Sequence, residues 1–197
     1  MEAMAAMPDN AYDLAIVDPP YGIGRSGKPK STSSHGGHKG YEFKGWDKST
    51  PSEQYFTELF RVSKNQIIWG ANYFTKFLPK SSGWILWDKG QRICQADGEL
   101  AFSSFNNPLR IYTLNRVALM IEGAIHPTQK PVALYKWLLT NYAKEGDKIL
   151  DTHLGSGSIA IACWEKGFDL DGWELDPDYH AAAVNRFHQH ASQLHIF

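Results

Sequence analysis

A carboxylate, two prolines and a tyrosine follow the first apolar run of the chain. Residues 14–17 have the length and the β-branched content of a buried strand, and Asp18-Pro19-Pro20-Tyr21 comes directly after them. The prolines end the strand, so Asp18 is expected at a carboxyl end, where α/β sheets bind their ligands. There the Asp18 carboxylate and the Pro19 carbonyl could accept the hydrogens of an exocyclic amine, and Tyr21 could stack on its base. Taken alone, these four residues are also compatible with a strand-to-turn corner that carries a packed tyrosine.

A glycine-rich turn lies near the other end of the chain, between an apolar strand and an apolar helix. The predicted strand covers residues 148–151, Gly155-Ser156-Gly157 forms the turn, and the predicted helix covers residues 159–164. The spacing differs from G-x-G-x-x-G, which argues against a nicotinamide cofactor. A further predicted strand at 170–175 delivers Glu174, seventeen residues after Gly157, about where a carboxylate meets ribose hydroxyls. The pattern therefore predicts a nucleoside-containing ligand.

Together these motifs resemble those of the amino-methyltransferases of DNA, specifically the adenine-N6 enzymes that use S-adenosylmethionine. The resemblance rests on Asp18-Pro19-Pro20-Tyr21, His126-Pro127-Thr128-Gln129-Lys130-Pro131, Gly155-Ser156-Gly157 and Gly172-Trp173-Glu174. The catalytic motif precedes the cofactor motif, as in the circularly permuted class of the family. The resemblance implies an α/β, Rossmann-like methyltransferase fold with a mostly parallel sheet, one antiparallel strand and helices on both faces.

The resemblance also implies roles for individual residues. Asp18, Pro19, Pro20 and Tyr21 are expected to be catalytic. The residues expected to contact S-adenosylmethionine are Asp151, His153, Gly155, Ser156, Gly157, Glu174, His126, Thr128 and Lys130. One position departs from the family, which has Asp-Pro-Phe before its glycine turn where this chain has Asp151-Thr152-His153. Because the phenylalanine lines the sulfonium end of the cofactor, His153 could weaken binding or leave the protein inactive.

The composition is that of an ordinary globular protein. The chain has 197 residues, of which 43% are hydrophobic and 21% charged. No apolar run has membrane-spanning length and the N-terminus lacks a signal pattern, so we expect a cytoplasmic protein without membrane contact. The two cysteines, Cys94 and Cys163, provide neither a disulfide framework nor a metal cluster, and no metal is expected. Cys163 lies in an apolar helical run and is predicted to be a small core residue.

We expect one methyltransferase domain over residues 1–197, divided into three parts. Residues 1–105 form the catalytic half, which includes a mobile loop at 22–48. Residues 106–125 form a target-recognition strip that is short for a module that reads DNA sequence. Residues 126–197 form the cofactor-binding half.

Double-stranded DNA is the expected partner, although the formal net charge of the chain is −1. Residues 22–50 contain six basic and two acidic residues, a local charge of +4, and they lack apolar periodicity. The predicted phosphate contacts are Arg25, Lys28, Lys30, Lys39, Lys44, Arg110 and Arg116. Tyr41, Phe43 and Trp46 are interleaved with these lysines and either stack on bases or anchor the loop to the body. The oligomeric state does not follow from the sequence, and a dimer is compatible with it.

The remaining patterns predict the elements that position these motifs. Helices are expected at 2–7, 50–63, 72–77 and 131–146 and from 176 onward, and strands at 66–69, 84–87 and 99–105. The strand at 99–105 is expected to run antiparallel. Thr50-Pro51-Ser52-Glu53 predicts a capping box with Thr50 as the N-cap. The histidines of the last helix, His180, His188 and His190, are expected on a solvated face.

Three functions remain open at this point. The first is transfer of a methyl group from S-adenosylmethionine to N6 of adenine in DNA after base flipping, with the protein supplying alignment and electrostatic stabilisation. The second keeps this chemistry with cytosine N4 or adenine in RNA as the acceptor, although the family tends to have serine in place of Asp18 for cytosine. The third is a catalytically degenerate fold that binds nucleic acid or serves as a partner subunit. The short recognition strip and His153 favour this third hypothesis, and the intact Asp18-Pro19-Pro20-Tyr21 motif argues against it.

Overall fold

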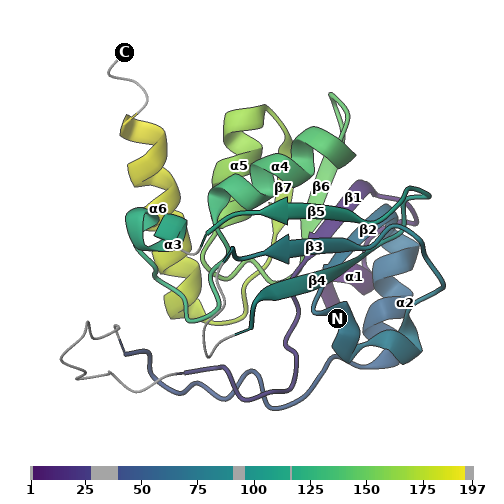
Figure 1. The fold of residues 1–197 in the computed structure, drawn as a ribbon, viewed down its shortest axis with the longest axis horizontal. Helices are drawn as coiled ribbons and strands as arrows, with labels where there is room; N and C mark the ends of the chain where they lie inside the picture. The colour runs from purple at the N-terminus through teal and green to yellow at the C-terminus, as the bar shows by residue number, and fades with distance from the viewer. Residues whose placement is uncertain (1, 28–39, 91–95, 116, 194–197) are drawn as a thin grey trace.

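The computed structural model of the protein describes residues 2–27, 40–90, 96–115 and 117–193 (Figure 1). Its strands are β1 (Tyr12–Val17), β2 (Ser63–Trp69), β3 (Ile85–Asp88), β4 (Gly98–Ser103), β5 (Arg110–Thr113), β6 (Lys148–Asp151) and β7 (Asp169–Gly172). Its α-helices are α1 (Glu2–Ala5), α2 (Glu53–Val62), α3 (Val117–Glu122), α4 (Val132–Tyr142), α5 (Ser158–Lys166) and α6 (Pro177–Gln193). Two short 3₁₀ helices, η1 (Ala71–Tyr73) and η2 (Thr75–Phe77), follow β2.

The strands form one seven-stranded sheet in the order β5-β3-β4-β2-β1-β6-β7. β1 runs parallel to β2 and β6, β6 parallel to β7, and β3 parallel to β5. β4 runs antiparallel to both of its neighbours, β2 and β3. The prediction of a mostly parallel sheet with one antiparallel strand near residues 99–105 is confirmed.

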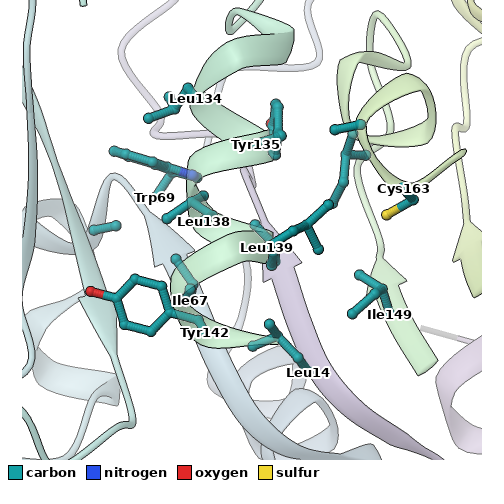
Figure 2. Packing of buried hydrophobic residues seen from close by; sticks show 14 of the residues in the cluster. Leu14, Ile67, Trp69, Leu134, Tyr135, Leu138, Leu139, Tyr142, Ile149 and Cys163 are labelled. Carbon is teal, nitrogen blue, oxygen red and sulfur yellow. The ribbon is translucent and has the colours of Figure 1, made fainter. Parts of the chain in front are cut away.

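Helices cover both faces of the sheet, because alternate residues of the central strands point to opposite sides. Leu14 and Ile16 of β1 belong to a buried cluster with residues of α4 and α5. Figure 2 shows this side, where Leu138 of α4 and Cys163 of α5 lie above the strands. Ala15 and Val17 belong to the cluster that includes α1 and α2. Both faces of β1 are therefore buried, which explains its uninterrupted apolar sequence.

The two predicted motifs lie at the carboxyl ends of neighbouring strands. Asp18 directly follows β1, and Gly155 lies in the loop after β6. These two strands are paired in parallel, with Leu14 opposite Ile149 and Ala15 opposite Leu150. Since parallel strands end at a common edge, the sheet brings both motifs to one crevice.

Helix α2 begins later than the capping pattern predicts. The N-cap is Ser52, whose hydroxyl accepts a hydrogen bond from the Tyr55 amide, so the assignment to Thr50 was wrong. Both residues can cap a helix, and packing decides between them because Tyr55 and Phe56 are buried in the first turn. Tertiary burial thus overrides the local capping signal.

Two further details differ from the sequence prediction. β7 ends at Gly172, two residues before Glu174, where its partner β6 also ends. Residues 106–125 contain an edge strand, β5, and a short helix, α3, neither of which was predicted. Cys163 is buried as predicted, whereas Cys94 lies outside the described residues. Within the described ranges no helix has the length and apolarity that a membrane crossing requires.

Candidate active site

Asp18 is the centre of a hydrogen-bonded cluster at the end of β1. One carboxylate oxygen accepts the Tyr21 hydroxyl at 2.5 Å, and the other accepts a hydrogen bond from the Lys130 ammonium. Burial raises the pKa of Asp18, and the neighbouring Lys130 opposes this shift. Lys130 therefore lies at the catalytic motif as well as at the predicted cofactor side.

A second carboxylate, Glu99 of β4, shares the same ammonium. Its Oε2 lies 3.1 Å from Lys130 Nζ, and its Oε1 lies 2.7 Å from Lys89 Nζ. Although burial opposes ionisation, the two ammonium groups lower the pKa of Glu99 to about 2. The carboxylates of Asp18 and Glu99 in turn outweigh burial and raise the pKa of Lys130. The cluster thus pairs two carboxylates with two ammonium groups inside the protein.

The Tyr21 ring packs against Tyr73, Phe74 and Gly70. It stacks on Tyr73 with ring centres 5.1 Å apart and makes an edge contact with Phe74. Gly70, in a left-handed conformation at φ +68°, lies so close that a Cβ there would be 2.1 Å from the Tyr21 ring. A base that stacks on Tyr21 therefore has to approach beside Tyr73 or displace it.

A cavity of about 390 Å³ lies between the Asp18 cluster and the glycine turn. This size is within the usual range for small-molecule sites. The predicted cofactor residues among its lining are His126, Thr128, Lys130, His153, Gly155, Ser156 and Glu174. Segments from three parts of the sequence thus converge on one cavity, as the motifs predicted.

Glu174 fixes the glycine turn from the neighbouring loop. Its two carboxylate oxygens accept the Gly155 amide at 2.8 Å and the Asp176 amide at 2.9 Å. Gly155 and Gly157 have φ values of +52° and +70°, which favour glycine, and a Cβ on Gly157 would lie 3.1 Å from Ala183. The carboxylate and the backbone of the turn are therefore presented together to the cavity.

The two histidines of the cavity carry no charge at neutral pH. Burial lowers the pKa of His126 to about 4 and the pKa of His153 to about 4. The His153 imidazole contacts the Thr152 hydroxyl at 2.9 Å and packs against Tyr55. The departure from the family at position 153 therefore adds a neutral ring and leaves the charge of the cavity unchanged.

Asp151 stabilises the loop that contains His153. Its side chain accepts the His153 amide at 2.9 Å, and the residue is 1% exposed. Burial raises the pKa of Asp151 to about 8, with Asp18 and Glu174 adding to the shift. Asp151 is not among the residues that line the cavity, so a direct cofactor contact from it remains a prediction.

A second cavity, of about 510 Å³, adjoins the first at Asp18. Its walls include Pro19, Tyr21, Tyr73 and Glu99. Residues that line both cavities are Asp18, Pro20, Trp46, Thr128, Gln129 and Lys130. Asp18 thus lies where the two cavities adjoin, and it contributes to the walls of both.

Residues 44–47, which we call the strap, extend from the first cavity to the second. The Lys44 ammonium lies 2.8 Å from Asp176 and 2.6 Å from Asp178. Trp46 stacks on His126 with ring centres 5.3 Å apart. The Asp47 carboxylate accepts two backbone amides of the loop after β1, Gly22 and Arg25, at 2.7 Å each. This part of the predicted loop is therefore fastened to the body at several points.

Among the described residues, the predicted phosphate-binding side chains of Arg25, Lys44 and Arg110 do not gather in one place. Arg25 lines the second cavity, whereas Lys44 is already paired with two carboxylates. Arg110 begins β5, so it lies at the amino ends of the parallel strands, whereas Asp18 lies at their carboxyl ends. Lys28, Lys30, Lys39 and Arg116 lie outside the described residues.

Sequence reasoning missed three polar contributors to the site: Lys89, Glu99 and the strap residue Asp47. Lys89 follows β3 and Glu99 lies in β4, and their pairing depends on the antiparallel register of these strands. A weak signal existed, because Lys89 follows a predicted strand at its carboxyl end. Glu99 gave none, since a lone glutamate in a strand resembles any solvated residue. Among the described residues, no three His, Cys, Asp or Glu side chains are grouped as ligands for a metal ion.

The family model described as DNA methylase, which covers N6 and N4 enzymes, matches residues 66–185. Type II methyltransferase M.HpaI of Haemophilus parainfluenzae is 25% identical over 232 residues, covering 94% of this chain and 71% of that protein. The family-model match includes β4, residues 126–130 and the glycine turn, and Asp18 precedes it.

Two solved structures share the fold at low sequence identity. A putative DNA modification methylase of Thermus thermophilus, complexed with S-adenosyl-L-methionine, has a TM-score of 0.60 at 17% identity, covering 96% of this chain and 92% of that one. The cytosine-N4-specific PvuII DNA methyltransferase has a TM-score of 0.58 at 10% identity, covering 96% and 86%. These likenesses identify the fold as the Rossmann-like methyltransferase fold.

Proposed function

The chain belongs to the DNA methylase family, and we propose that it methylates N6 of adenine in double-stranded DNA with S-adenosylmethionine as the methyl donor. The observation that carries this proposal is the position of the Asp18 carboxylate between two cavities. One cavity would hold the cofactor beside the glycine turn. The other would hold the base that has been flipped out of the duplex.

The cofactor cavity fits this ligand in both shape and charge. Glu174 would accept hydrogen bonds from the ribose hydroxyls, and the Gly155–Gly157 backbone would lie along the nucleoside. Thr128 and Lys130 would lie toward the methionine end. The neutral rings of His126 and His153 avoid repulsion of a cationic ligand. When bound, S-adenosylmethionine supplies a methyl group activated by its sulfonium charge.

Asp18 would align the target amine and take up the proton that it loses. The lone pair of an adenine amine is delocalised into the ring, so the nitrogen is a weak nucleophile. Hydrogen bonds from the amine to Asp18 Oδ and to the Pro19 carbonyl would favour a pyramidal nitrogen whose lone pair points at the cofactor cavity. Burial raises the pKa of Asp18, which favours transfer of the amine proton to its carboxylate as positive charge develops on nitrogen.

Adenine is favoured over cytosine by Asp18 itself, because the family tends to have serine at this position in cytosine-N4 enzymes. A cytosine-N4 activity is the second candidate, since the family model covers both amines and the PvuII enzyme shares the fold. A non-catalytic role is disfavoured by the complete Asp18 cluster, because a carboxylate with a shifted pKa in a cavity is typical of an active site.

Analysis of modified nucleosides tests this proposal. DNA from a methylation-deficient host that expresses the chain should contain N6-methyladenine, and DNA from a host that expresses Asp18→Ala should not. N4-methylcytosine in place of N6-methyladenine would establish the second candidate. Unmodified DNA, together with purified protein that binds S-adenosylmethionine but does not methylate DNA or RNA, would establish the non-catalytic role.

A further inference from the structure

Glu99 holds a position that the catalytic motif does not account for. It lies opposite Trp87 in the register of β3 and β4, and its side chain lines the cavity proposed for the target base. Both of its oxygens are engaged, one by Lys130 and one by Lys89. Burial of such charged groups carries a large desolvation cost. This cost suggests that the arrangement contributes to function.

Lys130 is saturated with hydrogen-bond acceptors. An ammonium group has three donors, and here they point to Asp18, to Glu99 and, at 3.3 Å, to the Tyr21 hydroxyl. The Lys130 side chain is 2% exposed, so water does not compete for these donors. The strength of its interaction with Asp18 therefore depends on how strongly Glu99 attracts it.

To bind the target amine, Asp18 would have to accept its hydrogen bond on an oxygen that already accepts another one. One oxygen already accepts from Tyr21 and the other from Lys130. An ammonium that interacts with Asp18 alone would reduce the charge available to the amine. Glu99 attracts the Lys130 ammonium and so weakens its interaction with Asp18. Lys89 limits this attraction because it binds the other oxygen of Glu99.

We propose that Glu99 is a positioning residue for methyl transfer, which shares the Lys130 ammonium with Asp18 and so sets how freely Asp18 accepts the target amine. The inference rests on the proposed function of the site. It assigns Glu99 no contact with the reacting atoms, and it assigns Lys89 the role of an anchor for Glu99.

The proposal makes opposite predictions for the two partners. In Glu99→Gln, kcat should fall roughly tenfold with little change in the KM for DNA, because a neutral amide attracts the ammonium less strongly than a carboxylate does. The acidic limb of the pH profile should move down by about one pH unit, since a negative charge near Asp18 has been removed. In Lys89→Met a positive charge is lost, so the acidic limb should move up.

Glu165 provides the matched control. It also lies between two basic side chains, Lys136 and His190, and is similarly exposed, but it belongs to α5 and lines neither cavity. Glu165→Gln should therefore leave both limbs of the pH profile in place. Groups that face Asp18 and are present in all variants are Lys130, Tyr21, Tyr55, Tyr135 and Asp151.

A titration without turnover separates this inference from the proposed function. Carbon-13 NMR of the Asp18 carboxyl in the free protein should show a lower pKa in Glu99→Gln and a higher pKa in Lys89→Met. This result would stand even if the parent protein did not methylate DNA. Equal Asp18 titration in the parent and both variants, or a loss of activity in Glu99→Gln without a shifted limb, would overturn the proposal.

Discussion

The Lys130 ammonium donates a hydrogen bond to the Asp18 carboxylate, which joins two motifs that lie 112 residues apart in the chain. One motif follows β1 and the other precedes α4. Both residues line both cavities, so this contact lies where the two cavities adjoin.

Glu174 is expected to be essential for cofactor affinity. Glu174→Ala removes the proposed acceptor for the ribose hydroxyls and leaves the Gly155 amide without its partner. Charge-assisted hydrogen bonds are each worth roughly 1.5–3 kcal/mol, so S-adenosylmethionine should bind at least about tenfold more weakly. Calorimetry on the folded variant checks this. Unchanged affinity would move the ribose contact to another residue.

His153 should affect the cofactor only at acidic pH. Its pKa is lowered to about 4, so protonation adds a positive charge beside a cationic ligand only as the pH falls toward that value. The affinities of the parent and of His153→Phe should therefore agree within roughly threefold between pH 6 and 8 and diverge below about pH 5. Binding isotherms over this range check the prediction. A divergence that begins near pH 6.5 would mean that the imidazole is not shielded by burial.

Arg186 of α6 braces the glycine turn from behind. It donates to the Ser156 carbonyl and to the Ser158 hydroxyl, both at 2.9 Å, and Glu122 holds it from α3 at 3.0 Å. Arg186→Met should weaken S-adenosylmethionine binding by about tenfold, because the turn loses its support.

Arg61→Met is the matched control for this brace. Arg61 of α2 also donates to backbone carbonyls, those of Met4 and Met7, but it lies away from the cofactor cavity. Its loss should lower the melting temperature and leave the affinity unchanged. Equal loss of affinity in both variants would show that Arg186 acts only through global stability.

The sequence predicted the parts of the site that depend on local signals. The position of Asp18 follows from an apolar run that ends at two prolines, and the turn at Gly155 follows from glycines between a strand and a helix. The helix predicted at 131–146 is present as α4, and Figure 2 shows its residues Leu134, Leu138 and Tyr142 in the buried cluster.

The rest of the site depends on contacts between distant segments. The Glu99–Lys89 pair requires the antiparallel register of β4, and the Lys44–Asp176 pair joins positions 132 residues apart. The edge strand β5 was missed because its side chains are mostly exposed and give no clear alternation. Such features follow from topology, which no short stretch of sequence contains.

The rate of methyl transfer by Asp18→Asn tests the central claim most directly. The amide keeps the shape of the carboxylate but weakens an acceptor at the moment when positive charge develops on the target nitrogen. Loss of one preorganised electrostatic contact of this kind typically costs about 10²–10³ in rate. The variant should bind S-adenosylmethionine nearly as the parent does and methylate DNA at least about a hundredfold more slowly. Methylation at close to the parent rate would contradict the account and reduce Asp18 to a structural residue.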